Sequence, residues 1–149
     1  MNNTQQKKNR GNYPSMLEIL REPGPEINPE IIRTLKLWKK CWYKKWKELR
    51  TEEKLQRLFL LVEVIWELDE SNVLNSTEFA DYYAWNPVTK TLLMDTERPS
   101  IISTLHEIGH SLYGKSELEA CRFSVWCFKT VFPKSFNSLK TERHMLKQI

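Results

Sequence analysis

Apolar residues recur at helical intervals along residues 29–50, with lysine or arginine in many of the positions between them. Asn28 suits the N-cap of a helix, and Pro29 suits the first helical position because its missing N–H would have no partner there. The pattern therefore predicts an amphipathic helix that runs from Pro29 to about Arg50. Its apolar face would contain Ile31, Leu35, Trp38, Trp42, Trp46 and Leu49.

The following stretch, residues 55–68, is apolar on nearly every side, so it is predicted to form the central core helix. Thr51 with two glutamates after it resembles the start of that helix. Ahead of the basic helix, residues 13–20 predict a short helix and residues 21–29, with three prolines and a glycine, predict a connector. Residues 1–12 are polar and are expected to form a flexible tail.

The apolar period changes at about Glu78. Residues 79–95 contain two β-rich runs around the sequence Asn-Pro-Val-Thr-Lys, which predicts a hairpin. Ser100 then suits the cap of a helix that ends at Gly114, and Ser116 with Glu119 forms a capping-box pattern for another helix. Residues 134–149 are basic and weakly patterned, so a docked terminal helix and a disordered segment both fit them.

These elements predict an α+β fold with several helices and a small antiparallel sheet. At 149 residues, with 40% of them hydrophobic, the chain suits one domain, expected over residues 13–149 with its core in residues 51–133. No apolar run is long enough for a transmembrane helix, and the first ten residues lack a signal-peptide centre. Three cysteines without CxxC spacing suit reduced thiols. A soluble cytoplasmic protein is expected.

Charge is segregated along the chain more strongly than its net value of +4 suggests. Residues 29–57 hold ten basic and four acidic side chains, whereas residues 62–119 hold three basic and eleven acidic ones. A basic helix with interleaved tryptophans has two interpretations: a face that binds nucleic acid or an anionic membrane surface, or an ordinary amphipathic helix that buries its tryptophans. The second is favoured, because any surface helix requires this pattern.

The acidic section contains the sequence HEIGH, in which His106 and His110 lie four residues apart on the predicted helix. Residues four apart project from the same face, so both imidazoles would point toward one place, with Glu107 beside them. Two histidine ligands and a carboxylate outside the first shell are what a zinc hydrolase uses: the ion activates water, and the carboxylate takes its proton. The ordinary alternative is a pair of histidines satisfied by carbonyl or carboxylate groups.

A catalytic zinc site needs a third protein ligand and one open position. The predicted helix after Gly114 follows a short turn and packs back on the first helix, which brings acids of its first turn toward the histidines. Glu117 and Glu119 are the candidates. Because they are two residues apart, both cannot point at one ion.

The run from the hairpin through STLHEIGHSL to ELEACRFSVWCFKTVFP resembles the ImmA/IrrE family of small zinc metallopeptidases of the HExxH, glutamate-ligand group, over residues 79–133. The resemblance implies a zincin-like fold, a Zn²⁺ cofactor, His106 and His110 as ligands and Glu107 as general base. It favours Glu119 as third ligand, with Glu117 as the alternative. It also implies a protein substrate such as a transcriptional repressor.

The leading functional hypothesis is therefore a zinc-dependent endopeptidase that cleaves an intracellular protein. An extended peptide substrate is expected to add to a sheet edge formed by Leu92, Leu93, Met94 and Asp95. The alternative for that edge is a cover formed by the chain's own terminus. The alternative function is a non-enzymatic DNA-binding or adaptor module that uses the basic, Trp-rich residues 29–57 and holds a structural or vestigial metal.

Overall fold

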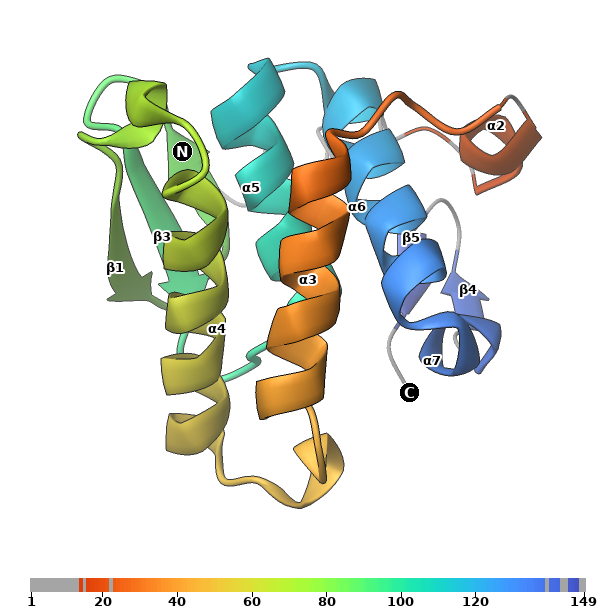
Figure 1. The fold of residues 1–149 in the computed structure, drawn as a ribbon, viewed down its shortest axis with the longest axis horizontal. Coiled ribbons are helices and arrows are strands. Elements are labelled where there is room, and N and C mark those ends of the chain that lie inside the picture. The colour runs from red at the N-terminus through yellow and green to blue at the C-terminus, as the bar shows by residue number, and fades with distance from the viewer. Residues whose placement is uncertain (1–13, 15, 22, 139, 143–144, 148–149) are drawn as a thin grey trace.

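The computed structural model describes residues 14, 16–21, 23–138, 140–142 and 145–147, which form helices and two small sheets (Figure 1). The predicted α+β class is confirmed. The tail expected over residues 1–12 lies outside the described residues. The α-helices are α2 (Met16–Arg21), α3 (Pro29–Trp42), α4 (Thr51–Trp66), α5 (Ile101–Tyr113), α6 (Glu117–Val131) and α7 (Pro133–Asn137), and two 3₁₀ helices are η1 (Trp46–Glu48) and η2 (Glu70–Asn72).

The helix predicted from Pro29 begins there, with the Asn28 side chain accepting a hydrogen bond from the backbone N–H of Glu30 at 2.9 Å. Its predicted end at Arg50 is wrong, since α3 ends at Trp42. The chain then turns through Lys45, whose φ of 59° lies in the left-handed region, and Trp46 belongs to η1. Apolar spacing continues across this break because both segments pack on the same core.

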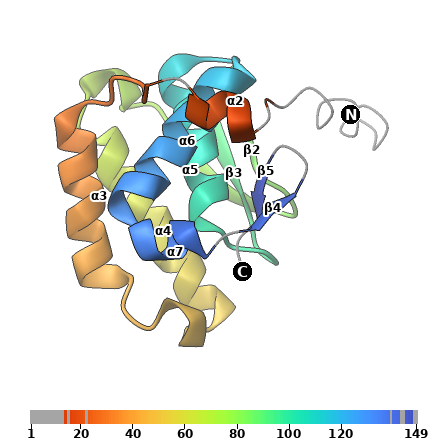
Figure 2. The ribbon, with the colours of Figure 1, turned by 90° about the vertical axis from the view of Figure 1, so that its right-hand side faces the viewer.

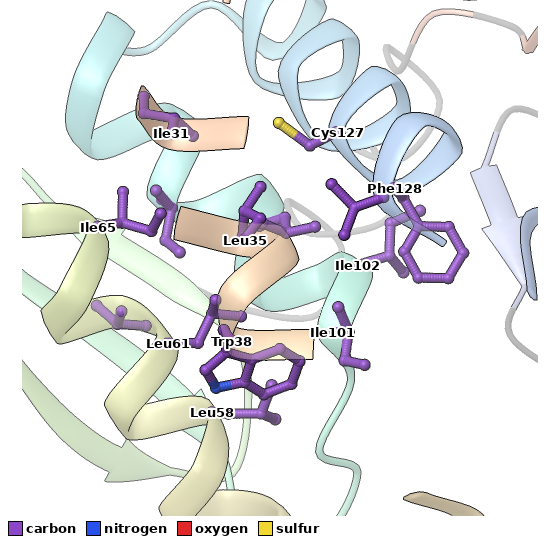
Figure 3. Close-up of a cluster of buried hydrophobic side chains, with 14 of the residues drawn as sticks. Ile31, Leu35, Trp38, Leu58, Leu61, Ile65, Ile101, Ile102, Cys127 and Phe128 are labelled. Carbon is purple, nitrogen blue, oxygen red and sulfur yellow. The ribbon is translucent and has the colours of Figure 1, made fainter. Parts of the chain in front are cut away.

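Helices α3, α4, α5 and α6 enclose the main core, in which aliphatic and aromatic side chains from all four meet (Figure 3). Trp38 and Trp46 are only 3% and 8% exposed, so the interpretation that buries the tryptophans is confirmed for these two. Trp42 is 41% exposed. The labelled core residues in the figure are Ile31, Leu35, Trp38, Leu58, Leu61, Ile65, Ile101, Ile102, Cys127 and Phe128.

The main sheet has three strands, β1 (Ser76–Ala80), β2 (Ala84–Asn86) and β3 (Thr91–Asp95), in the order β1-β3-β2. Strands β2 and β3 form the predicted hairpin and are antiparallel. The first β-rich run is not one strand: it is split by a bend, and its earlier part, β1, runs parallel to β3. The sheet is therefore mixed rather than antiparallel.

Strand β3 is the central strand, which overturns the prediction that residues 92–95 form an open edge. Both of its sides are occupied by neighbouring strands, and its core-facing side chains Leu92 and Met94 are fully buried. A peptide has no access to β3. Order in the chain could not reveal this, because the parallel partner comes from residues before the hairpin.

The N-terminal short helix predicted over residues 13–20 is found as α2, which packs on the outer side of α6 (Figure 2). Ile19 is fully buried there against Cys121 and Val125. After α6, the chain forms α7 and then the antiparallel pair β4 (Lys140–Glu142) and β5 (Met145–Lys147). Within the described part of the chain, no helix has the length and apolar character needed to cross a bilayer.

Candidate metal centre

Helices α5 and α6 carry the centre; both begin where the sequence predicts, and α5 also has its predicted C-cap at Gly114. The Ser100 hydroxyl caps α5 by accepting from the backbone N–H of Ser103 at 3.2 Å. Helix α5 ends at Gly114, whose φ of 94° is readily adopted only by glycine. The Ser116 hydroxyl caps α6 by accepting from the N–H of Glu119 at 3.2 Å. The short connection folds the start of α6 back toward the histidine face of α5.

His106 and His110 lie on that face with their ring centroids 4.8 Å apart. They are 6% and 9% exposed, so the surrounding protein fixes both rings. The two carboxylate oxygens of Glu117 contact them separately: Oε2 is 3.0 Å from His106 Nε2, and Oε1 is 2.9 Å from His110 Nε2. One ligand atom from each of the three residues lies within 4.8 Å of the others.

The third member of this group is Glu117, the alternative choice, and not Glu119, the first choice. Glu117 is the first residue of α6, and its side chain reaches back across the turn to the rings. Glu119 is exposed and lies two residues further on, which is about 200° around the helix. The structure therefore places the alternative, Glu117, against the histidines, and which glutamate binds an ion stays a prediction.

The donor set fits a catalytic zinc ion. Two imidazole nitrogens and one carboxylate form one of the sets that hold such an ion and leave a position open. His110 Nδ1 lies 2.8 Å from the carbonyl oxygen of Gly114, and since a carbonyl only accepts, Nδ1 carries the hydrogen. That bond directs Nε2 toward Glu117 and is the kind of outer contact that orients metal-binding histidines.

Cys121 lies behind the His106 ring and is not one of the proposed ligands. Its sulfur lies 3.7 Å from His106 Nδ1, on the opposite side of the ring from Glu117. Burial, together with the charges of Glu117 and Glu107, raises the pKa of this thiol to about 12, so it stays protonated. A protonated thiol is a poor metal ligand.

His110 and Glu117 shift each other's pKa in opposite directions. Burial acts to lower the pKa of His110, but hydrogen bonds to Glu117 and to the Gly114 carbonyl outweigh it and raise that pKa to about 9. Burial acts to raise the pKa of Glu117, but its hydrogen bonds to the two histidines outweigh it and lower that pKa to about 2. A proton on His110 therefore occupies the place where a divalent cation would bind.

Glu107 is buried beside this group and is only 9% exposed. Its pKa is raised, chiefly by burial, while the nearby histidines and a hydrogen bond from the backbone N–H of Trp85 act in the opposite direction. A carboxylate whose pKa is moved up toward neutrality is better suited to accept and return a proton. The structure thus brings His106, Glu107 and His110 together as the sequence predicts.

Tyr83 attaches the hairpin to α5, although no sequence pattern predicts this role. Its hydroxyl oxygen accepts from the backbone N–H of Ser100 at 2.9 Å and from the Thr104 hydroxyl at 3.3 Å. These bonds hold the start of β2 beside α5. No sequence signal distinguishes this tyrosine from its neighbour Tyr82.

Gly109, inside the motif, allows α5 and α6 to approach closely. A Cβ at this position would lie 3.1 Å from Ala120 Cα and 3.2 Å from Phe123 Cδ2. Glycine in a helix interior is unfavourable, so a glycine in the middle of a helix with regular apolar spacing is a sequence signal of close packing. Because Glu117 belongs to α6, this close approach sets how far its carboxylate lies from the histidines.

Comparison of the chain with protein-family models, with curated proteins and with solved structures found no match. The assignment of a function therefore depends on the geometry of this His-His-Glu group and of the carboxylate beside it.

Proposed function

We propose that this protein is a zinc-dependent endopeptidase that acts on an intracellular protein. The observation that carries the proposal is the meeting of the buried His106 Nε2 and His110 Nε2 with the half-buried Glu117 carboxylate, with Glu107 next to them. Zinc is the ion proposed because two imidazoles and one carboxylate are characteristic of catalytic zinc sites. The resemblance of residues 79–133 to ImmA/IrrE metallopeptidases agrees with this choice of chemistry.

In this mechanism each side chain has a separate task. His106, His110 and Glu117 would hold the ion, which supplies Lewis acidity for polarising a peptide carbonyl and activating water. Glu107 accepts the proton of the attacking water and then delivers it to the nitrogen of the leaving amine. The backbone N–H of Trp85 favours the ionised form of Glu107, which is the form that accepts the proton. Burial of Glu107 excludes bulk water from the proton path.

We also propose that the protein acts in the cytoplasm and that its substrate is a protein such as a transcriptional repressor. The compartment is supported by Cys41, Cys121 and Cys127, which are all unpaired, as is usual where thiols stay reduced. The substrate class is supported only by the family resemblance.

The test compares zinc content and peptide cleavage in the wild type, Glu107→Gln and Glu119→Gln. Zinc is measured by atomic emission, and cleavage is followed with a mixture of internally quenched peptides. We expect wild-type zinc content in all three proteins, with a loss of about 10²- to 10⁴-fold in cleavage rate for Glu107→Gln alone. Glu119→Gln is the matched control because it removes an exposed carboxylate from the same helix pair. Full cleavage by Glu107→Gln would rule out the proposed base, and a purified protein without zinc would rule out the cofactor.

One observation favours a second candidate, a DNA-binding module that uses the basic surface of α3. Leu37 and Trp42 are 62% and 41% exposed on a helix whose lysines are mostly exposed, and Arg57 lies over the Trp42 ring at 5.9 Å. Binding of a DNA duplex is measured across a salt series with the wild type and Glu107→Gln. Affinity that falls steeply with salt and is equal in both proteins would favour this candidate. Absence of binding at low salt would exclude it.

A further inference from the structure

A cavity of about 490 Å³ lies between the last turns of α4 and the beginning of β1, and none of its lining residues belongs to the metal centre. Figure 1 shows β1 at the outer side of the main sheet, with α4 running beside it. The residues that line this cavity, here called the acidic groove, are Phe59, Glu63, Trp66, Glu67, Asp69, Glu70, Asn72, Val73, Asn75, Ser76 and Thr77.

The acidic groove combines negative charge with an apolar base. Four of its lining residues are aspartate or glutamate, and none is lysine or arginine. Phe59 and Trp66 supply aromatic surface, and Trp66 is fixed by a hydrogen bond from its ring N–H to the Ser111 hydroxyl at 2.9 Å. Carboxylates around an aromatic base suit the long side chains of lysine and arginine, which bury their methylenes and keep the charged end at the rim.

Strand β1 forms one wall of the groove and presents an open edge within the described part of the chain, because its one neighbour in the sheet is β3. The Ser76 N–H bonds to the Lys90 carbonyl, and the Ala80 carbonyl accepts from the Thr96 N–H. Main-chain groups of a parallel strand alternate in direction, so Thr77 and Phe79 direct their N–H and C=O groups away from β3. These are the groups that an added strand would use.

The same alternation decides where the side chains of an added strand would lie. Thr77 pairs with Leu92 and Phe79 with Met94, whose side chains are buried in the core, so Thr77 and Phe79 face the α4 side of the sheet. Phe79 is nevertheless 57% exposed at that margin. Every second side chain of a strand added beside β1 would therefore lie over the groove, opposite Glu63 in α4 and Glu67 at the C-cap of α4.

We infer that the acidic groove and the β1 edge together form a docking site for an extended segment of another protein, with lysine or arginine at every second position. The main chain of the segment adds to β1 as a further strand, and its basic side chains enter the groove. Charge complementarity selects this occupant, since an acidic or wholly apolar strand would leave the four carboxylates without counter-charges. The site does not require the metal centre and is independent of the proposed peptidase activity.

The test uses a fluorescent peptide in which lysine alternates with threonine and valine. Its binding to the 149-residue protein is measured by fluorescence anisotropy at low salt. A second peptide of the same composition carries N-methyl groups on alternate residues, which blocks strand pairing. The protein variants are Glu63→Gln/Glu67→Gln, Thr77→Pro and the matched control Glu48→Gln/Glu52→Gln, which removes two exposed glutamates near the start of α4. Thr77→Pro removes an outward N–H and leaves the pairing with β3 intact.

We expect the first peptide to bind the wild type saturably. Its affinity should fall about tenfold or more in Glu63→Gln/Glu67→Gln and in Thr77→Pro, and should be unchanged in the control variant. The N-methylated peptide is expected not to bind. Equal binding of both peptides, or equal affinity of the groove variant and the control, would overturn the inference. So would a wild-type dimer in sedimentation that Glu63→Gln/Glu67→Gln converts to monomer, because the occupant would then be a second copy of this chain. Thermal melts of each variant exclude loss of the fold as the cause.

Discussion

At the scale of single residues, the choice between two glutamates decides whether the histidine pair has a third ligand. Glu117 bridges both Nε2 atoms, whereas Glu119 is exposed and directed elsewhere. We predict that Glu117→Gln lowers zinc affinity by on the order of 100-fold or more, since an amide oxygen is a weaker ligand than a carboxylate. Glu119→Gln should leave the affinity unchanged. Competition titration against a chromogenic chelator measures both variants, and the opposite ranking would return the role to Glu119.

The charge shared by His110 and Glu117 predicts a pH dependence for the chelator-treated protein. The pKa of His110 is raised from 6.5 to about 9 in the folded protein, so protonated His110 stabilises the fold. This stabilisation is complete below pH 6.5 and is lost as the pH rises through 9. The pKa of Glu117 is lowered from 4.5 to about 2, so its contribution is present above pH 4.5 and is lost as the pH falls through 2.

The melting temperature of the chelator-treated protein should therefore fall between pH 6.5 and pH 9. Glu117→Gln should show a smaller fall, because the hydrogen-bonded carboxylate that contributes to holding the proton on His110 is gone. Differential scanning calorimetry in excess chelator makes the comparison. Parallel pH profiles for the two proteins would contradict the coupling between these side chains.

His106, Glu107 and His110 could be predicted from sequence because their relation is local: a four-residue spacing on a helix fixes which side chains share a face. The third residue could not, since it depends on how α6 is rotated against α5, which is a property of their packing. The partner of Glu107 had no signal at all. It is the backbone N–H of Trp85, and every residue except proline carries that group.

At the scale of elements, the contact of α5 with α6 positions the metal centre. The variant Gly109→Ala tests whether this contact is close, because the sign of the change in the free energy of unfolding differs between a close and a loose contact. Alanine in an exposed helix would stabilise by about 1 kcal/mol over glycine, but here the added methyl group would press on Ala120 and Phe123 and should cost about 1–3 kcal/mol. We expect a lower free energy of unfolding in urea together with weaker zinc binding. A more stable variant would show that the helices can separate freely.

The elements themselves were predicted well where apolar spacing, caps and turn residues agree. Asn28, Ser100, Gly114 and Ser116 all act at the helix ends where they were placed. The errors arose where tertiary contacts decide. Helix α3 ends at Trp42 although apolar spacing continues to Leu49, and β1 pairs with a strand that lies beyond the β2 segment. Pairing between distant strands leaves no periodic trace in the chain.

At the scale of the whole molecule, metal binding and folding should be coupled, because the ligands come from two helices of one core. An ion that binds only the folded chain stabilises it by about 2.7 kcal/mol at 100 times its dissociation constant. For a chain of this size, we predict a rise of about 5–10 °C in melting temperature on addition of zinc. Magnesium, which prefers oxygen ligands, should give no rise. A zinc-induced rise that persists in His106→Ala/His110→Ala would locate the ion elsewhere.

The backbone contact between Trp85 and Glu107 has a consequence for how this protein can change over evolutionary time. Since this contact uses the main chain, a change of side chain at position 85 need not remove it, provided that proline is avoided and that the new side chain still packs against the core beside Trp66. Mutations that repack this part of the core can thus accumulate while the acid–base group keeps its main-chain contact.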